Sequence, residues 1–377
     1  MKSGKITLCK AASMLLLLSM AICVMFFVSC EKHYEGGKDV DDTPYLTFTA
    51  ITEQTLTVKL KNNYRLSETL QYSVGYGKWK SLIANTAITF GGENGTLRLR
   101  GKSAEGLATS YIEYAHIAFD NSDVMVACSG DIRTLVDYEK YSTADTQNAR
   151  FCYMFYGCAQ LISAPELLAT TLATQCYSHM FLNCTNLEVA PALPATIVTD
   201  LCYMSMFSNC FNLKAAPALP ATTLGRQCYA YMFSACKSLK VAPELPATTL
   251  GYECYDNMFV DCTNLEVAPA VLPATTLAEG CYYCMFCDCE NLANAPKLPA
   301  KTLVRSCYRY IFFGCEKLDS ITMLATDISA SSCLTEWVSG VASTGTFTKA
   351  AEMTSLQTGV NGIPEGWTVV DYEDPAN

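Results

Sequence analysis

The sequence predicts an α/β repeat solenoid with a short strand and a helix in each 26-residue unit, preceded by a small all-β, sandwich-like domain. Three observations predict it. The motif Phe-x-x-Cys-x-x-Leu recurs seven times from residue 150, each unit carries apolar residues four positions apart, and residues 45–145 alternate between apolar and polar side chains. Half of the 377 residues are apolar and 16% are charged, which is typical of a packed chain rather than a disordered one.

The first thirty residues have the layout of a secretory signal peptide. A basic start precedes the apolar run MLLLLSMAICVMFFVS, which ends at Cys30. The end FVSC resembles a bacterial lipobox, in which the cysteine is lipid-modified and becomes the new N-terminus. An uncleaved transmembrane anchor is the alternative, but the run is short for a span of about 20 residues. We therefore expect a lipoprotein signal peptide over 1–29, lipid attachment at Cys30, and a flexible acidic tether over 30–44.

The charge of the chain argues against one class of partner. The formal net charge is −10, and removal of residues 1–29, which hold three lysines and no acid, leaves −13. A surface of this sign is expected to repel nucleic acid and anionic lipid head groups. We therefore expect no nucleic-acid partner and attachment to the membrane through the lipid anchor.

Residues 45–145 consist of short runs with alternating polarity. Examples are YLTFTA, TLTVKLK, LQYSVGYG and TLRLRG, and glycine- and asparagine-rich breaks separate several of them. This pattern is typical of a small antiparallel β domain, and we expect a sandwich. We find no candidate site residue in this domain.

Residues 150–333 form the repeat. The motif phenylalanines are spaced 26 residues apart with one step of 27, at Phe155, Phe181, Phe207, Phe233, Phe259, Phe286 and Phe312. Repeats of 20 to 29 residues with regular leucines belong to leucine-rich-repeat solenoids. A single unit of this kind cannot bury its apolar side alone, so stacked neighbours must bury it jointly.

The second half of each unit predicts a helix. In one unit the apolar residues fall at i, i+4, i+8 and i+12, namely Leu224, Cys228, Met232 and Cys236. This spacing places them in one stripe on a helix of about three turns. The segment ATTL before it offers Thr222 or Thr223 as an N-cap.

The first half of each unit predicts a short strand, such as one near 187–190. Pro191 and Pro194 follow, and because proline has no N–H donor we expect extended backbone outside a continuous ladder there. Residues 334–377 lose the repeat. Their tryptophans, Trp337 and Trp367, indicate a C-terminal cap and tail that cover the last open unit.

The repeat unit CYxxMFxxCxxLxxAPxLPATTL resembles the BspA-type leucine-rich repeats of surface lipoproteins from host-associated anaerobic bacteria. The preceding LQYSVGYGKW…LRLRG…SGDIRTLVDY and the closing GTFTK…IPEGWTV are similar to the flanks of such arrays. The resemblance implies a surface or envelope lipoprotein that acts in adhesion to host proteins or to other bacteria. It implies no catalytic residue and names no ligand.

Fourteen of the 21 cysteines occupy two positions of the repeat, eight residues apart. On one helix these two positions are about 12 Å apart, too far for a disulfide. Packed helices 8–10 Å apart also disfavour bridges between units. We expect small buried thiols, although export would permit disulfides.

One cluster, CYYCMFCDC, adds Cys284 and Cys287 to the two expected positions. We expect these two side chains to face outward. A surface disulfide, inert thiols and a zinc site are all open, but only two ligands would share the outer face and no histidine is near in sequence. We therefore expect no metal and no other cofactor, and the redox state of the pair stays open.

A tyrosine follows the first cysteine of the repeat in six units, and the six form a candidate binding strip: Tyr177, Tyr203, Tyr229, Tyr255, Tyr282 and Tyr308. Stacked along the solenoid, they could bind a glycan or an extended partner. In the alternative, each ring packs between neighbouring helices with its hydroxyl at the surface.

Motifs of catalysis are absent from the sequence. It has three histidines, one in the tether, one in the β domain and His179 in a repeat, and no nucleophile elbow, zinc-protease motif, P-loop or dinucleotide fingerprint. We predict a binding protein rather than an enzyme. It would be lipid-anchored at the outer membrane, exposed at the cell surface, and would bind a host or bacterial protein or glycan. A structural or assembly role in the cell envelope without an external ligand is the alternative.

Overall fold

The computed structural model describes residues 41–373, and residues 44–373 belong to one compact unit, Pro44–Asn377. The predicted signal peptide, Cys30 and most of the tether lie outside the described residues. The strands are β1 (Leu46–Thr49), β2 (Gln54–Lys61), β3 (Gln71–Val74), β4 (Lys80–Ser81), β5 (Ile88–Phe90), β6 (Leu97–Arg100), β7 (Tyr114–Phe119), β8 (Val126–Ser129), β9 (Leu161–Ser163), β10 (Ile197–Val198), β11 (Thr223–Leu224), β12 (Ser320–Met323), β13 (Thr346–Lys349) and β14 (Thr368–Asp371). Three 3₁₀ turns accompany them: η1 (Gly92–Asn94), η2 (Ile132–Leu135) and η3 (Tyr141–Thr143).

The N-terminal part of this unit consists of two β-sheets. One has the strand order β4-β3-β6-β1-β8-β9 and the other β5-β2-β7. Their inner faces meet where Phe48 of β1 contacts Phe119 of β7, with ring centroids 6.0 Å apart. β9 pairs in parallel with β8 and belongs to the first turn of the repeat region. The sheet therefore continues directly into the repeats, and one hydrophobic core runs from Leu46 to Trp367.

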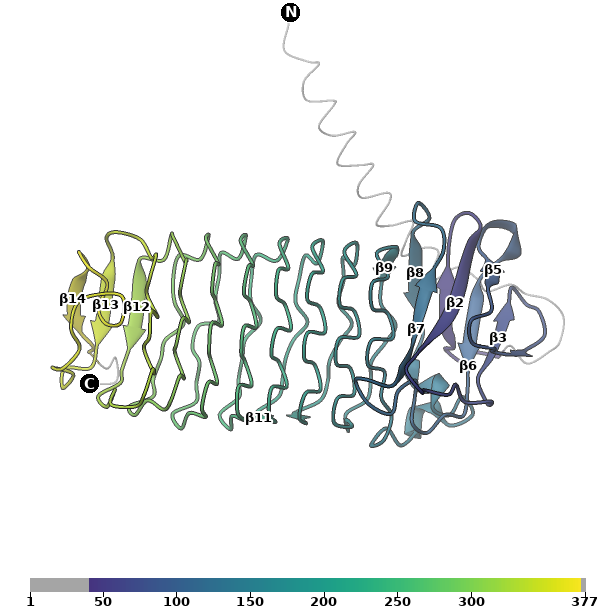
Figure 1. The fold of residues 1–377 in the computed structure, drawn as a ribbon, viewed down its shortest axis with the longest axis horizontal. Coiled ribbons are helices and arrows are strands. Elements are labelled where there is room, and N and C mark those ends of the chain that lie inside the picture. The colour runs from purple at the N-terminus through teal and green to yellow at the C-terminus, as the bar shows by residue number, and fades with distance from the viewer. Residues whose placement is uncertain (1–40, 374–377) are drawn as a thin grey trace, which may run out of the picture. The chain divides into compact units, whose positions relative to one another are not determined.

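The repeat region is a β-solenoid of about seven turns, so the prediction of a helix in each unit is wrong. No α-helix is present among residues 41–373, and the 3₁₀ turns all precede the repeats. Figure 1 shows the turns lying side by side in one row between β9 and β12. Isolated parallel bridges join equivalent residues of neighbouring turns, as at Val189, which pairs with Ser163 and Ala215. The strand expected near 187–190 is thus reduced to single bridges.

The segment predicted as a helix is a chain of β-turns. Alternate N–H groups close turns onto the carbonyl three residues earlier, as from Met232 to Tyr229 at 3.1 Å. The N–H groups between them donate to backbone carbonyls of the next turn of the solenoid. Three such bonds from the middle of one turn run from Tyr229 to Cys254, from Tyr231 to Asp256 and from Phe233 to Met258. Every second peptide therefore points its N–H toward the C-terminal end. The hydrogen bonds run between turns instead of along a helix.

One residue in four of this segment has a left-handed backbone. In the turn that contains Met232 these are Gln227, Tyr231 and Ala235, with φ values of 49°, 56° and 57°. Because each β-turn unit has four residues, buried apolar side chains recur every 4.0 residues, whereas on an α-helix they recur every 3.6 residues on average. The stripe Leu224, Cys228 and Met232 is buried as expected, but the repeated turns bury it and not a helix.

The sequence contains a sign of this backbone that the helix prediction missed. The residue before the second repeat cysteine has positive φ in every turn. It is almost always glycine, asparagine or aspartate: Gly157, Asn183, Asn209, Ala235, Asp261, Asp288 and Gly314. These residue types tolerate the left-handed region and are poor helix formers.

The segment ATTL forms strand-like contacts instead of a helix cap. Thr223 lies in β11, pairs with Ile197 of β10 and bridges to Thr249. The carbonyl of Thr222 accepts the N–H groups of Thr248 and Thr249, at 3.2 Å each. Neither Thr222 nor Thr223 caps a helix, because none begins there.

The C-terminal segment extends the parallel stacking. β12, β13 and β14 form a three-stranded parallel sheet, with Ile321 opposite Phe347 and Phe347 opposite Val369. Trp337 is fully buried, and its indole N–H donates to the carbonyl of Gly362 at 2.9 Å. The segment that follows the last repeat thus adds further parallel strands and covers the end of the core.

Candidate binding surface

The six tyrosines of the candidate binding strip lie in the core. Each is 1% exposed, and successive rings stack with centroids 5.5–5.9 Å apart. A parallel ladder of the repeat phenylalanines runs beside them at 5.3–5.9 Å. The tyrosine side chains therefore hold the turns together and offer no surface to a partner, which corrects the expectation for Tyr177, Tyr203, Tyr229, Tyr255, Tyr282 and Tyr308.

The repeat cysteines are buried free thiols. The distance of 8–10 Å predicted between neighbouring units is wrong, because equivalent residues of adjacent turns lie one strand spacing apart, about 4.8 Å. From the second unit on, the second cysteine donates its S–H to the phenylalanine carbonyl of the preceding turn, as from Cys236 to Phe207 at 3.2 Å, whereas Cys158 of the first unit donates to the carbonyl of Ile117. Burial raises the pKa of Cys228 and Cys236 well above the ordinary value. These thiols are thus poor nucleophiles and poor metal ligands.

Cys284 and Cys287 form a disulfide with Cα atoms 4.9 Å apart. Both are largely buried, at 9% and 6% exposure, so they are not at the surface as expected. The bridge closes the four-residue turn that the N–H of Cys287 also closes onto the carbonyl of Cys284 at 3.2 Å. Among residues 41–373 no cluster of three or more histidine, cysteine or acidic side chains could hold a metal ion.

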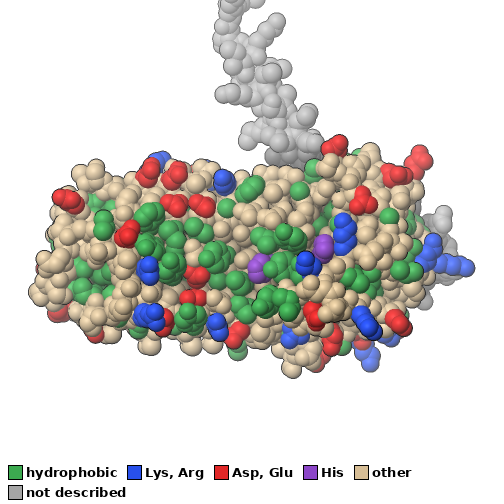
Figure 2. Space-filling model, viewed as in Figure 1, with side chains coloured by type: hydrophobic (Ala, Val, Ile, Leu, Met, Phe, Trp, Pro, Cys, Tyr) green, Lys and Arg blue, Asp and Glu red, His purple; other side chains and the backbone are tan. Residues whose placement is uncertain are grey.

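One side of the solenoid, which we call the turn face, is formed by the outward residues of the β-turn segments. Its central column has a different residue in almost every turn, and Ser205, Asn257 and Cys284 among them are largely covered by their neighbours: Tyr153, His179, Ser205, Tyr231, Asn257, Cys284, Tyr310 and Glu336. Figure 2 shows hydrophobic side chains and histidine gathered along the middle of one face, with charged side chains around them. Three tyrosines of the turn segments are exposed at 37–40%: Tyr156, Tyr231 and Tyr252.

An aromatic stack occupies the N-terminal end of the turn face. The rings of Tyr114 and Tyr153 are 4.5 Å apart, and those of Tyr153 and His179 are also 4.5 Å apart. Nδ1 of His179 is 2.7 Å from the hydroxyl of Ser178. Burial lowers the pKa of His179 to about 4, so the imidazole is neutral at physiological pH. The stack therefore presents a neutral aromatic edge.

A carboxyl group lies near the middle of the turn face. Asp256 is 8% exposed and accepts a hydrogen bond from the side-chain amide of Asn257 at 2.5 Å. Burial, with a smaller contribution from the negative charge of Glu253, raises the pKa of Asp256 to about 7. Tyr231 and Tyr283 lie near enough for their pKa values to respond to it.

We expect the substitution Asp256→Asn to stabilise the protein at alkaline pH. Because the pKa is raised in the folded state, the stability that proton binding confers is complete below about pH 4 and is lost as pH rises through about 7. A shift of this size corresponds to at most about 4 kcal/mol. Urea unfolding at pH 8 and pH 4 measures it. Equal stability of the two proteins at pH 8 would contradict the assignment, and Asp261→Asn, at an exposed neighbouring position, is the control.

A second aromatic group lies toward the C-terminal end of the turn face. The guanidinium of Arg309 lies 4.9 Å from the ring centroid of Tyr310 and 5.7 Å from that of Tyr283. Phe313 meets Tyr310 edge-on, with centroids 5.9 Å apart. The turn face thus carries an aromatic group on each side of the small residues Ser205 and Ala230.

On a different side, the strand face, two kinds of side chain recur in several turns. Pairs of exposed threonines recur at 170–171, 222–223, 248–249 and 275–276. The apolar side chains of Val189, Val241 and Val267 are 65%, 55% and 51% exposed. Ion pairs join neighbouring turns beside them, between Lys214 and Glu188 at 2.5 Å and between Lys240 and Glu266 at 2.8 Å.

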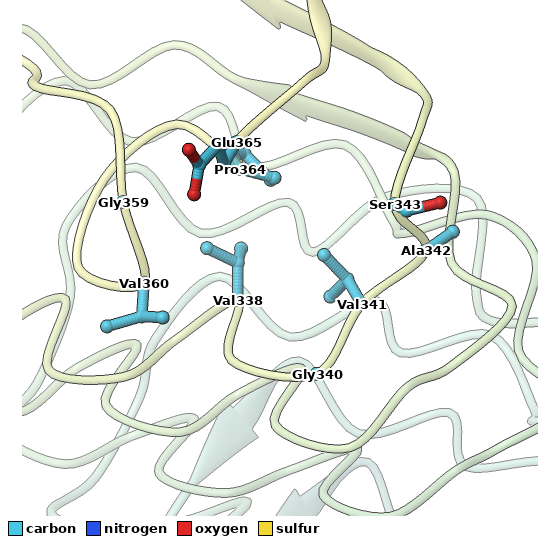
Figure 3. A pocket seen from close by; sticks show the side chains of 9 residues that line it. All are labelled: Val338, Gly340, Val341, Ala342, Ser343, Gly359, Val360, Pro364 and Glu365. Atoms are coloured by element: carbon cyan, nitrogen blue, oxygen red, sulfur yellow. The ribbon is translucent and has the colours of Figure 1, made fainter.

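A small pocket lies beside the last turn. Figure 3 shows it between the segment Val338–Ser343 and the loop Gly359–Glu365, with valine side chains on its walls and Glu365 at one side. Its lining is mainly aliphatic, and a single carboxylate is its only charged group. This arrangement provides no pair of acid and base for catalysis.

The β domain holds a group of side chains that the sequence interpretation missed. The guanidinium of Arg100 lies between Trp79 and Tyr138, at 4.1 and 4.2 Å from the ring centroids. Arg98 lies 5.3 Å from the Trp79 ring centroid and 5.8 Å from that of Tyr76. We call Tyr76, Trp79, Arg98, Arg100 and Tyr138 the cation–aromatic cluster. Its sign in the sequence is a pair of runs: YGKWK combines two aromatic and two basic residues, and in LRLR arginine alternates with leucine.

Comparison of the chain with protein-family models, with curated proteins and with solved structures gave no match. Within residues 41–373, no helix has the length and apolar character needed to cross a membrane.

Proposed function

We propose that this chain is an exported, lipid-anchored protein of the cell envelope whose solenoid binds a protein or glycan at the cell surface. One observation carries the proposal. Inside the solenoid the repeats are nearly uniform, with the same cysteine, tyrosine, methionine and phenylalanine positions in successive turns, whereas the central column of the turn face changes from turn to turn. A regular core that supports a varied, partly aromatic surface suits recognition of a partner.

The turn face is the proposed binding surface. Its exposed tyrosines have large rings and polar hydroxyls, a combination that is enriched in protein and glycan interfaces. The strand face offers the same paired threonines in four units and an exposed valine in three, which gives little basis for discrimination between partners. This assignment replaces the buried tyrosine ladder as the candidate site.

Binding is tested with two matched triple variants of the mature chain. Tyr156→Ser, Tyr231→Ser and Tyr252→Ser change the turn face, whereas Val189→Ser, Val241→Ser and Val267→Ser change the strand face. Cells displaying each variant are tested for adhesion to host extracellular proteins and to glycan-coated surfaces. We expect adhesion to fall at least about tenfold in the tyrosine variant, because interface aromatics often contribute 2 kcal/mol or more each, and to stay unchanged in the valine variant. Unchanged adhesion in the tyrosine variant would contradict the proposed surface.

Location is tested by protease treatment of intact cells, with immunoblotting for residues 45–377 beside a periplasmic control protein. Cleavage of the chain with the control spared is the expected result. Protection until the outer membrane is permeabilised would instead favour a structural role inside the envelope.

A further inference from the structure

The outer face of the six-stranded sheet concentrates positive charge in an otherwise acidic chain. Residues 71–102 contain five basic residues and one acid, although the whole chain has a net charge of −10; one of the five, Lys102, is paired with Glu139 at 2.6 Å. Lys78 and Lys80 are exposed and flank Trp79. Neither these lysines nor the two arginines of the cation–aromatic cluster form an ion pair within residues 41–373.

Strand register explains why the arginines lie on this face. β6 alternates Leu97, Arg98, Leu99 and Arg100, and both leucines are buried in the core. Alternate residues of a strand point to opposite sides, so both arginines point outward. They lie opposite residues of β3 that they contact: Arg98 donates to the Ser73 hydroxyl at 3.3 Å and Arg100 to the Gln71 side chain at 2.9 Å.

The cluster lies where the chain leaves its N-terminal tether. The ring of Tyr45 packs 4.9 Å from Trp79, and Arg100 lies 6.0 Å from the Tyr45 ring centroid. Tyr45 is fifteen positions after Cys30, so even a fully extended chain holds this face within roughly 50 Å of the lipid attachment site. Tyr76, whose ring centroid lies 5.8 Å from the guanidinium of Arg98, is 79% exposed.

From these observations we propose that the cation–aromatic cluster docks the β domain onto the anionic phosphate surface of the membrane that bears its lipid anchor. The proposal rests on the proposed function in one respect: the lipid anchor is what brings the cluster close to the membrane. The affinity of the cluster for anionic lipid depends on its own side chains. Lysine and arginine attract anionic head groups, and tryptophan and tyrosine favour the interface between water and lipid. The net negative charge elsewhere does not prevent this, because charges beyond about 8–10 Å are largely screened at physiological salt.

The test uses the mature chain from residue 30 with Cys30→Ser, so that no acyl chain contributes. Binding to phosphatidylcholine vesicles with and without phosphatidylglycerol is measured by flotation. We expect binding to the phosphatidylglycerol vesicles, weakened at least about tenfold by Lys78→Glu with Lys80→Glu, since each basic residue near an anionic surface contributes several-fold in affinity. The matched control reverses the charges of two lysines that are exposed on β2 of the other sheet, through Lys59→Glu with Lys61→Glu.

The site of contact is read from tryptophan fluorescence. Trp337 and Trp367 are buried, so quenching by brominated lipid reports on Trp79. Quenching in the unaltered chain, lost in the Lys78 and Lys80 variant, supports docking through the cluster. The proposal is overturned if neither vesicle is bound, if both charge reversals weaken binding equally, or if a soluble acidic polysaccharide binds the cluster more tightly than the vesicles do. Acylation of Cys30 is measured separately by incorporation of labelled palmitate into cells, so failure of the anchor and failure of docking are distinguished.

Discussion

Replacement of Phe233 by alanine is expected to lower the free energy of unfolding by about 3–5 kcal/mol. Phe233 is fully buried, and its ring stacks at 5.7 Å on Phe207 and at 5.5 Å on Phe259. Each turn of a solenoid is stabilised by its two neighbours, so a cavity in a middle turn weakens both interfaces. The loss should also uncouple the two halves of the array.

Urea unfolding followed by tyrosine fluorescence measures this effect. We expect a lower midpoint and a broader or two-step transition, because the two-state approximation fails when a repeat array loses cooperativity. Tyr231→Ala is the matched control, since this outward aromatic two residues earlier is 37% exposed and should cost less than about 1 kcal/mol. A loss for Phe233→Ala as small as that of the control would show that the phenylalanine ladder does not hold the turns together.

Substitution of Asn209 by isoleucine is expected to destabilise the protein by about 2–3 kcal/mol. The backbone of Asn209 has a φ of 60°, where a β-branched side chain is strained. The substitution also removes the hydrogen bond from its amide to Asn183 at 2.8 Å. In a helix the same change would be neutral or favourable, because isoleucine is a better helix former than asparagine. The experiment therefore distinguishes the β-turn segment from the helix that the apolar spacing predicts.

Asn212→Ile provides the control for Asn209→Ile. Asn212 also donates its amide to the equivalent residue of the previous turn, Asn186, at 3.0 Å, but it lacks the left-handed backbone. Asn209→Gly provides a second control, because glycine accepts the positive φ and loses only the hydrogen bond. We expect thermal unfolding to rank Asn209→Ile well below both. Equal melting temperatures for the two isoleucine variants would contradict the backbone assignment.

The backbone beneath the turn face is held in place by hydrogen bonds, which affects how the turn face could bind a partner. Its varied side chains stand on a backbone whose N–H groups alternately bond to the next turn, as Tyr231 does to Asp256, and close β-turns within their own segment, as Met232 does onto Tyr229. Surface substitutions such as those of Tyr156 and Tyr252 leave those bonds and the buried ladders intact. A partner would therefore meet a surface that is varied in chemistry and held in fixed geometry, which limits the entropy lost on binding.

The sequence alone determined that the chain repeats every 26 residues from residue 150 and that its stripes, such as Leu224, Cys228 and Met232, are buried. It did so because burial depends on the order of apolar residues, whatever backbone carries them. It also marked the left-handed positions through Asn183, Asn209 and Asp261, a sign that the helix prediction overlooked.

Only the tertiary structure decided between a helix and a row of β-turns. An apolar residue at every fourth position is compatible with both backbones. Which of the two forms depends on hydrogen bonds between residues 25 or 26 positions apart, such as the bond from Tyr229 to Cys254. Those bonds also decided that the tyrosine ladder is core and not surface, since a turn spacing of about 4.8 Å lets rings such as Tyr203 and Tyr229 stack inside. The cation–aromatic cluster likewise formed only when the pairing of β6 with β3 placed Arg98 and Arg100 on one outer face.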